Sequence, residues 1–87
     1  MGATYTVRVK DSAERELRRL PKQDARRIGK RLQGLASDPR PSGSVRLTGE
    51  DAYRVRQGDY RMVYTIDDRN RLVEVTRIRH RREVYRS

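Results

Sequence analysis

The stretch AYRVRQGDYRMVY, residues 52–64, decides the fold of this chain. Two runs of aromatic and β-branched residues, interleaved with polar ones, flank a short segment that contains Gly58. Such runs on either side of a short glycine-containing turn predict a β-hairpin. Alternate side chains of a strand share a face, so Arg54 and Arg56 point the same way, and Arg61 follows on the return strand. This arginine-rich surface is either a solvated sheet face or a phosphate-binding one.

Length and composition limit the class of protein. A chain of 87 residues is large enough for one domain with a modest core, so we expect a single domain over residues 1–87. The absence of cysteine excludes a disulfide framework and a cysteine-type zinc site. No apolar stretch approaches the length of a membrane span and no signal-peptide core begins the chain. We therefore expect a cytoplasmic protein that is not bound to a membrane.

The net charge is +10, from 22 basic and 12 acidic residues, and nearly all of the basic residues are arginine. Basic residues occur along the whole chain, so the charge belongs to the folded body rather than to a tail. A field of this sign attracts polyanions. Arginine adds bidentate contacts to phosphate and stacking on bases. The composition favours a nucleic-acid partner and is also compatible with an acidic protein.

The first half of the chain predicts one strand and two helices. Residues 4–9 alternate as a strand, and Asp11 or Ser12 is expected to cap the helix that follows. Pro21 ends that helix. A second amphipathic helix is expected over residues 22–36, with apolar residues on one stripe and basic residues on the other.

The second half predicts a sheet. A loop over residues 37–44 leads into the hairpin, and the turn at residues 67–70 precedes a last strand over residues 72–78. Strict alternation in that strand places Leu72 and Ile78 on one face. The predicted fold class is α+β: an N-terminal strand, a two-helix hairpin, then an antiparallel three- to four-stranded sheet covered on one face by the helices.

Few residues are suited to acid–base chemistry. His80 is the only histidine, which excludes a histidine pair and a two-histidine metal site. Asp67 and Asp68 are expected to bond the backbone of their turn, so neither a metal nor a cofactor is predicted. Arginines and one tyrosine remain as candidates: Arg54, Arg56, Arg61, Arg81 and Tyr85.

These candidates suit one task. Arginine is not a base at neutral pH, but it holds a phosphodiester and neutralises charge that builds on the phosphate oxygens. RNA supplies its own nucleophile, the 2′-hydroxyl, so a positioning surface with few acid–base groups suffices for transesterification. The alternative is that each arginine is a solvated strand residue and that Tyr85 is an apolar peg closing the end of the sheet.

Four segments resemble the RelE/ParE toxin superfamily: RLTG at residues 46–49, YRVR at 53–56, GDYRMVY at 58–64 and IRHRREVY at 78–85. The hairpin motif is similar across the superfamily, including members that are not nucleases. The ending HRREVY is more similar to RelE, the ribosome-dependent mRNA endonuclease of type II toxin–antitoxin modules. The resemblance spans nearly the whole chain.

This resemblance implies the following site. Catalytic roles fall on three residues: Arg61 stabilises the phosphate, Arg81 protonates the leaving 5′-oxygen, and Tyr85 stacks on or activates the nucleotide. RNA or phosphate binding falls on Arg54 and Arg56. Arg46, in the first similar segment, and His80, at the rim beside Arg81, complete the expected binding set.

The resemblance also implies partners. We expect a cognate antitoxin, acidic and partly disordered, in a toxin–antitoxin hetero-oligomer, and we expect mRNA in the ribosomal A site as the substrate of a metal-independent endoribonuclease. Two alternatives share the fold. One is a ParE-like inhibitor of DNA gyrase without nuclease activity, and the other is an inactive basic domain that only binds an antitoxin.

Overall fold

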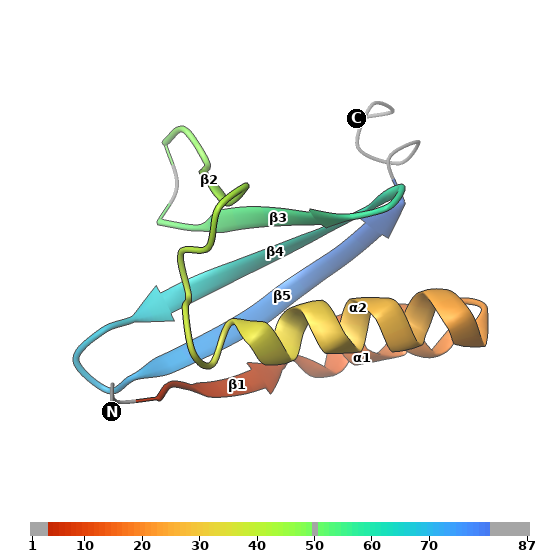
Figure 1. Ribbon diagram of the computed structural model, residues 1–87, viewed down its shortest axis with the longest axis horizontal. Helices are drawn as coiled ribbons and strands as arrows, with labels where there is room; N and C mark the ends of the chain where they lie inside the picture. The colour runs from red at the N-terminus through yellow and green to blue at the C-terminus, as the bar shows by residue number, and fades with distance from the viewer. Residues whose placement is uncertain (1–3, 50, 81–87) are drawn as a thin grey trace.

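The computed structural model describes residues 4–49 and 51–80. Its elements, shown in Figure 1, are β1 (Thr6–Val9), α1 (Asp11–Arg18), α2 (Lys22–Gly34), β2 (Val45–Arg46), β3 (Tyr53–Gln57), β4 (Tyr60–Asp67) and β5 (Leu72–His80). This order confirms the predicted α+β fold. None of the described helices is long and apolar enough to cross a membrane.

The strands form one mixed sheet in the order β1-β5-β4-β3-β2. β1 pairs with β5 in parallel, from Thr6 opposite Leu72 to Val9 opposite Val75. The pairs β2–β3, β3–β4 and β4–β5 are antiparallel. The first strand thus joins the sheet beside a later one, as the sequence predicts, and the chain between this parallel pair contains both helices and the strands β2 to β4.

The hairpin of β3 and β4 is confirmed. Gln57 lies opposite Tyr60, which leaves Gly58 and Asp59 as a two-residue turn. Gly58 has a φ of 60°, in the left-handed region that side chains other than glycine rarely adopt. The glycine therefore fixes the tight turn, and the tight turn fixes the register of the two strands.

The core lies between α2 and one face of the sheet. α2 contributes Ile28 and Leu32 at helical spacing, and Leu35 follows directly after the helix. Their buried partners on the strands are Val55, Met62, Tyr64, Val73, Val75 and Ile78, with Ala13 of α1 beside them. The other face of the sheet carries no such apolar cover among the described residues.

A β-bulge in β5 overturns the predicted alternation of that strand. Val63 of β4 lies opposite Arg77, but the next residue, Tyr64, lies opposite Val75, so Thr76 is the extra residue. The hydroxyl of Thr76 donates to the carbonyl oxygen of Val63 at 3.3 Å. The bulge puts Ile78 on the core face with Val75, and Arg77 on the opposite face.

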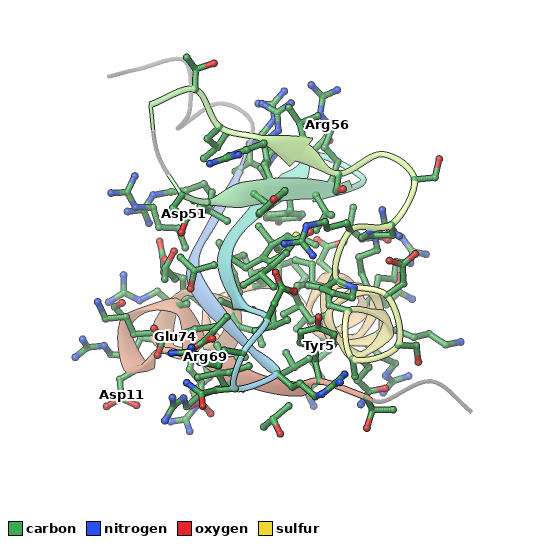
Figure 2. All side chains as sticks on the ribbon, turned by 90° about the vertical axis from the view of Figure 1, so that its left-hand side faces the viewer. Tyr5, Asp11, Asp51, Arg56, Arg69 and Glu74 are labelled. Carbon is green, nitrogen blue, oxygen red and sulfur yellow. The ribbon has the colours of Figure 1, made fainter. Side chains whose placement is uncertain are left out.

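The two helices occupy different positions around the sheet. Figure 2 shows α1, marked by Asp11, on one side of the long strands and α2 on the other. α2 covers the core face, whereas α1 lies along β5 beyond the end of β1. Ala13 of α1 nevertheless belongs to the same core as Ile28 and Leu32 of α2, so both helices bury apolar side chains in one core, α2 over the sheet face and α1 at its β5 edge. The predicted cap was wrong: α1 begins after Lys10 and has no side-chain cap.

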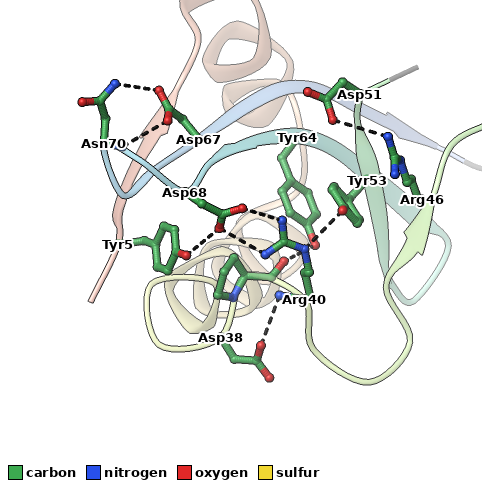
Figure 3. A network of polar contacts seen from close by, with 11 residues as sticks. Tyr5, Asp38, Arg40, Arg46, Asp51, Tyr53, Tyr64, Asp67, Asp68 and Asn70 are labelled. Atoms are coloured by element: carbon green, nitrogen blue, oxygen red, sulfur yellow. Dashed lines mark hydrogen bonds and ion pairs between the residues drawn. The ribbon is translucent and has the colours of Figure 1, made fainter. Parts of the chain in front are cut away.

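The loop between α2 and β2 is held by Arg40 (Figure 3). Its guanidinium donates to both carboxylate oxygens of Asp68, at 3.2 and 2.9 Å, and to the hydroxyl of Tyr53 at 3.1 Å. The hydroxyl of Tyr5 donates to the same carboxylate at 2.6 Å. These hydrogen bonds, from Arg40 first and then from Tyr5, lower the pKa of Asp68 to about 2.

A buried tyrosine also holds the loop between α2 and β2 in place. The hydroxyl of Tyr64 donates to the carbonyl oxygen of Pro39 at 2.7 Å, and burial raises the pKa of Tyr64. In the following turn Asp67 accepts from the backbone and side-chain nitrogens of Asn70, as predicted, and these bonds lower its pKa. Asp68 instead ties this turn to the loop through Arg40.

Candidate nucleic-acid interface

The sheet face opposite the core carries the predicted arginines. Arg54 and Arg56 alternate with the buried Val55 on β3, so both point away from α2. Arg61 lies directly opposite Arg56 in the hairpin register. Residues that are opposite each other in an antiparallel pair share a face. The structure therefore brings these three arginines together.

The bulge adds two more arginines from β5. Arg79 lies opposite Arg61, and Arg77 lies opposite Val63. One row across the sheet is Arg56, Arg61 and Arg79, and the next is Arg54, Val63 and Arg77. We call the surface made by Arg54, Arg56, Arg61, Arg77 and Arg79 the arginine face.

Arg61 is the most enclosed member of the arginine face. It is 7% exposed, whereas Arg56 and Arg77 on the flanking strands are exposed. A partly enclosed guanidinium interacts more strongly with an anion than one in bulk water, because the effective dielectric constant is lower there. Of the arginines on this face, the enclosed Arg61 would therefore interact most strongly with an anion that reached it.

The arginine face borders a groove. A cavity of about 800 Å³ separates it from α1, with Val63, Thr65 and Thr76 on its floor. Lys10, Arg15 and Arg19 of the α1 side line the opposite wall, together with Glu16. The surface is therefore recessed and mainly cationic, a shape that fits an extended polyanion better than a flat partner.

Two of the predicted binding residues lie elsewhere. Arg46 is opposite Tyr53 in register, and its guanidinium contacts Asp51 at 3.8 Å. His80 is opposite Tyr60, and their rings meet edge to face with centroids 5.2 Å apart. Because Tyr60 alternates with Arg61, the Tyr60–His80 pair lies on the other side of the sheet from the arginine face.

The two remaining predicted residues, Arg81 and Tyr85, lie outside the described residues. Sequence reasoning missed Arg77 and Arg79 as members of the site, since strict alternation does not anticipate the bulge at Thr76. Within residues 4–49 and 51–80, no cluster of histidine, aspartate and glutamate is placed to hold a metal ion.

The structure is thus a small α+β fold whose sheet packs against α2 on one face and carries arginines on the other. A family model described as "ParE toxin of type II toxin-antitoxin system, parDE" matches residues 7–85. The chain belongs to this toxin family.

Similarity to individual toxins shows which branch of the family the chain belongs to. The chain is 33% identical to Toxin RelG and 37% identical to Toxin RelE, both of Mycobacterium tuberculosis, over 84 residues in each case. These matches cover 94% of this chain, and 97% and 87% of the two relatives. The structure matches that of the toxin–antitoxin complex RelBE2 of M. tuberculosis with a TM-score of 0.80 and 30% identity, covering 88% of this chain and 98% of that one. The protein is a RelE-type toxin of the type II class.

Proposed function

We propose that this toxin is a metal-independent endoribonuclease that cleaves mRNA in the A site of the ribosome. The observation that carries the proposal is the row of Arg56, Arg61 and Arg79 across three strands, with Arg61 enclosed between the other two. A phosphodiester lying on this row meets guanidinium groups on its non-bridging oxygens. The resemblance of the chain to RelE toxins supports RNA rather than another polyanion as the substrate.

The proposed reaction is a transesterification. The 2′-hydroxyl of the nucleotide before the cut gives up its proton to solvent as its oxygen attacks phosphorus, and the bond from phosphorus to the 5′-oxygen breaks. The products are a 2′,3′-cyclic phosphate and a 5′-hydroxyl. Arg61, with Arg54 and Arg56, stabilises the charge on the phosphorane oxygens. Arg81 delivers the proton to the leaving 5′-oxygen, and Tyr85 stacks on the nucleotide and activates it through the hydroxyl that phenylalanine lacks. The groove aligns the RNA, which accounts for a large share of the rate in such a reaction.

The test is cleavage of mRNA on programmed ribosomes, with the ends mapped. We expect cuts within the A-site codon, loss of activity in Arg81→Ala and Tyr85→Phe, and a drop of about 10²- to 10³-fold in kcat for Arg61→Ala. Arg26→Ala, an exposed change on α2 far from the arginine face, is the control and is expected to cleave normally. Intact mRNA with the wild-type protein would rule out the proposal.

We also propose a cognate antitoxin, acidic and partly disordered, that forms a hetero-oligomer with the toxin in the cytoplasm. The net charge of +10 supports an acidic partner, and the RelBE2 relative is itself a toxin–antitoxin complex. A partner that binds only the folded toxin raises its melting temperature. Equal melting temperatures with and without the antitoxin would contradict this partner.

The description of the matching family model favours one second candidate, inhibition of DNA gyrase in the manner of a ParE toxin. Such a protein acts by binding gyrase and needs no phosphate-binding row. A supercoiling assay separates the two functions. Inhibition of supercoiling by the wild type and equally by Arg61→Ala, with RNA left intact, would favour gyrase.

A further inference from the structure

Among residues 4–49 and 51–80, no strand lies beside the far half of β5 on the β1 side. The pairing of β1 with β5 ends at Val9 opposite Val75, while β5 continues to His80. An uncovered strand edge presents backbone N–H groups without partners. Here α1 lies along this edge, and one of its side chains supplies the missing acceptor.

That side chain is Glu16, whose two carboxylate oxygens hold two successive residues of β5. One oxygen, Oε1, accepts from the backbone nitrogen of Ile78 at 3.3 Å, and the other, Oε2, forms an ion pair with Arg79 Nη1. The side chain of Glu16 is only 22% exposed. A carboxylate that is mostly removed from water and bonded through both oxygens holds its partners more firmly than an exposed ion pair does.

The contact also changes the charge pattern of the arginine face. Arg56, Arg61 and Arg79 stand in one row, and like charges on adjacent strands repel one another. Glu16 neutralises Arg79 and draws its guanidinium toward α1. In this row Arg61 therefore lies between Arg79, whose charge is neutralised by Glu16, and the exposed Arg56.

We propose that Glu16 is a positioning residue for RNA cleavage. It fixes the end of β5 through Ile78 and orients Arg79, so that Arg61 in the same row keeps the geometry the reaction needs. The inference rests on the proposed nuclease function. It concerns a residue of α1 that does not itself touch the RNA.

The test compares Glu16→Ala and Glu16→Gln with a matched control on the same helix. Glutamine keeps an oxygen that can accept from Ile78 but gives up the charge, whereas alanine removes both contacts. Glu14 pairs with Arg18 at 3.1 Å on the exposed side of α1, so Glu14→Ala removes an ion pair of similar chemistry away from β5. Two quantities are measured: exchange of the Ile78 amide hydrogen in the free protein, and kcat and KM for cleavage on programmed ribosomes.

We expect faster exchange at Ile78 in Glu16→Ala and a kcat lower by about 10- to 100-fold with KM little changed, because a misplaced group costs rate more than binding. Glu16→Gln lies between alanine and wild type in both quantities. Glu14→Ala behaves as wild type. A circular-dichroism melt checks that each variant is folded at the assay temperature. If Glu16→Ala is not folded, the comparison is made with Glu16→Gln instead.

Three results would overturn the inference. If exchange at Ile78 is unchanged in both Glu16 variants, Glu16 does not hold the end of β5. If exchange is faster but kcat is normal, the contact has no role in catalysis. An equal loss of kcat in Glu14→Ala assigns the effect to α1 as a whole. If wild-type protein leaves mRNA intact, the proposed function fails instead, and the exchange data still report whether Glu16 holds β5.

Discussion

Arg56 and Arg61 are direct cross-strand partners in the β3–β4 hairpin and point to the same face of the sheet. Two like charges in such a position destabilise the pair that carries them. The hairpin therefore keeps an arrangement that costs stability, which is common where a surface serves to bind a ligand of opposite charge. A phosphate between the two guanidiniums would offset this repulsion.

The first prediction is that Arg56→Thr makes the free toxin more stable and its RNA binding weaker. Threonine suits a strand and removes one of the two opposed charges, so the free energy of unfolding should rise by roughly 0.2–1 kcal/mol. Urea unfolding measures this change. The control is Arg8→Thr, because Arg8 lies opposite Glu74 and pairs with it at 3.7 Å. There the same substitution removes an attraction, and no gain in stability is expected.

The second prediction concerns the salt dependence of RNA binding. Replacing Arg54 and Arg77 by glutamine should lower the slope of log K against log salt for a single-stranded RNA oligonucleotide by about 1.4, or about 0.7 for each phosphate that is no longer neutralised. Fluorescence anisotropy at several salt concentrations gives the slope. The matched control replaces Lys22 and Arg26, which are exposed on α2. If both double variants change the slope equally, binding depends on total charge and not on the arginine face.

The third prediction separates two tyrosine hydroxyls. Tyr64 donates to Pro39 from a fully buried position, whereas the hydroxyl of Tyr53 accepts from Arg40 among exposed groups. Tyr64→Phe should cost about 1 kcal/mol of unfolding free energy, since the carbonyl of Pro39 loses a buried partner. Tyr53→Phe should cost less, because water can replace its hydroxyl. If chemical denaturation gives Tyr64→Phe and Tyr53→Phe the same loss of unfolding free energy, the contact with Pro39 does not anchor the loop.

The fourth prediction is an acid limit to stability set by Asp68. Its pKa falls to about 2 in the folded protein, chiefly because Arg40 donates to it, while an unfolded aspartate titrates near about 3.9. A depressed carboxylate pKa stabilises the fold above the unfolded value, and this contribution is lost as the pH falls from about 4 through about 2. Thermal melts across that range should show a steep fall in melting temperature for the wild type. In Asp68→Asn the melting temperature should be lower near neutral pH, and its fall in acid shallower. If the melting temperature of Asp68→Asn falls with pH as steeply as that of the wild type, other carboxylates cause the loss of stability in acid.

Local pattern was sufficient for much of the fold. The hairpin followed from alternation around Gly58, and α2 followed from apolar residues at helical spacing with Pro21 before them. These features depend on neighbours in the sequence, which is why one chain without a structure can predict them. That Arg54 and Arg56 lie on one face could also be predicted from the sequence, because it depends only on the two-residue period of a strand.

Three features of the structure depended on contacts between distant segments. The bulge at Thr76 arises from the register of β5 against β4, and it turns Arg77 and Arg79 onto the arginine face. Glu16 meets Ile78 only because β1 is short and α1 continues along the same edge. The bond from Arg40 to Asp68 joins a loop to a turn far away in the chain.

The sequence alone thus determined the elements, the basic character of the sheet and the identity of the hairpin arginines, since these depend on composition and local periodicity. Only the tertiary structure decided which arginines stand in one row, that His80 lies on the other side of the sheet, and that an acidic residue of α1 holds the end of β5. Register between strands and the path of a helix along a sheet edge are set by packing of the whole chain, and no local pattern encodes them.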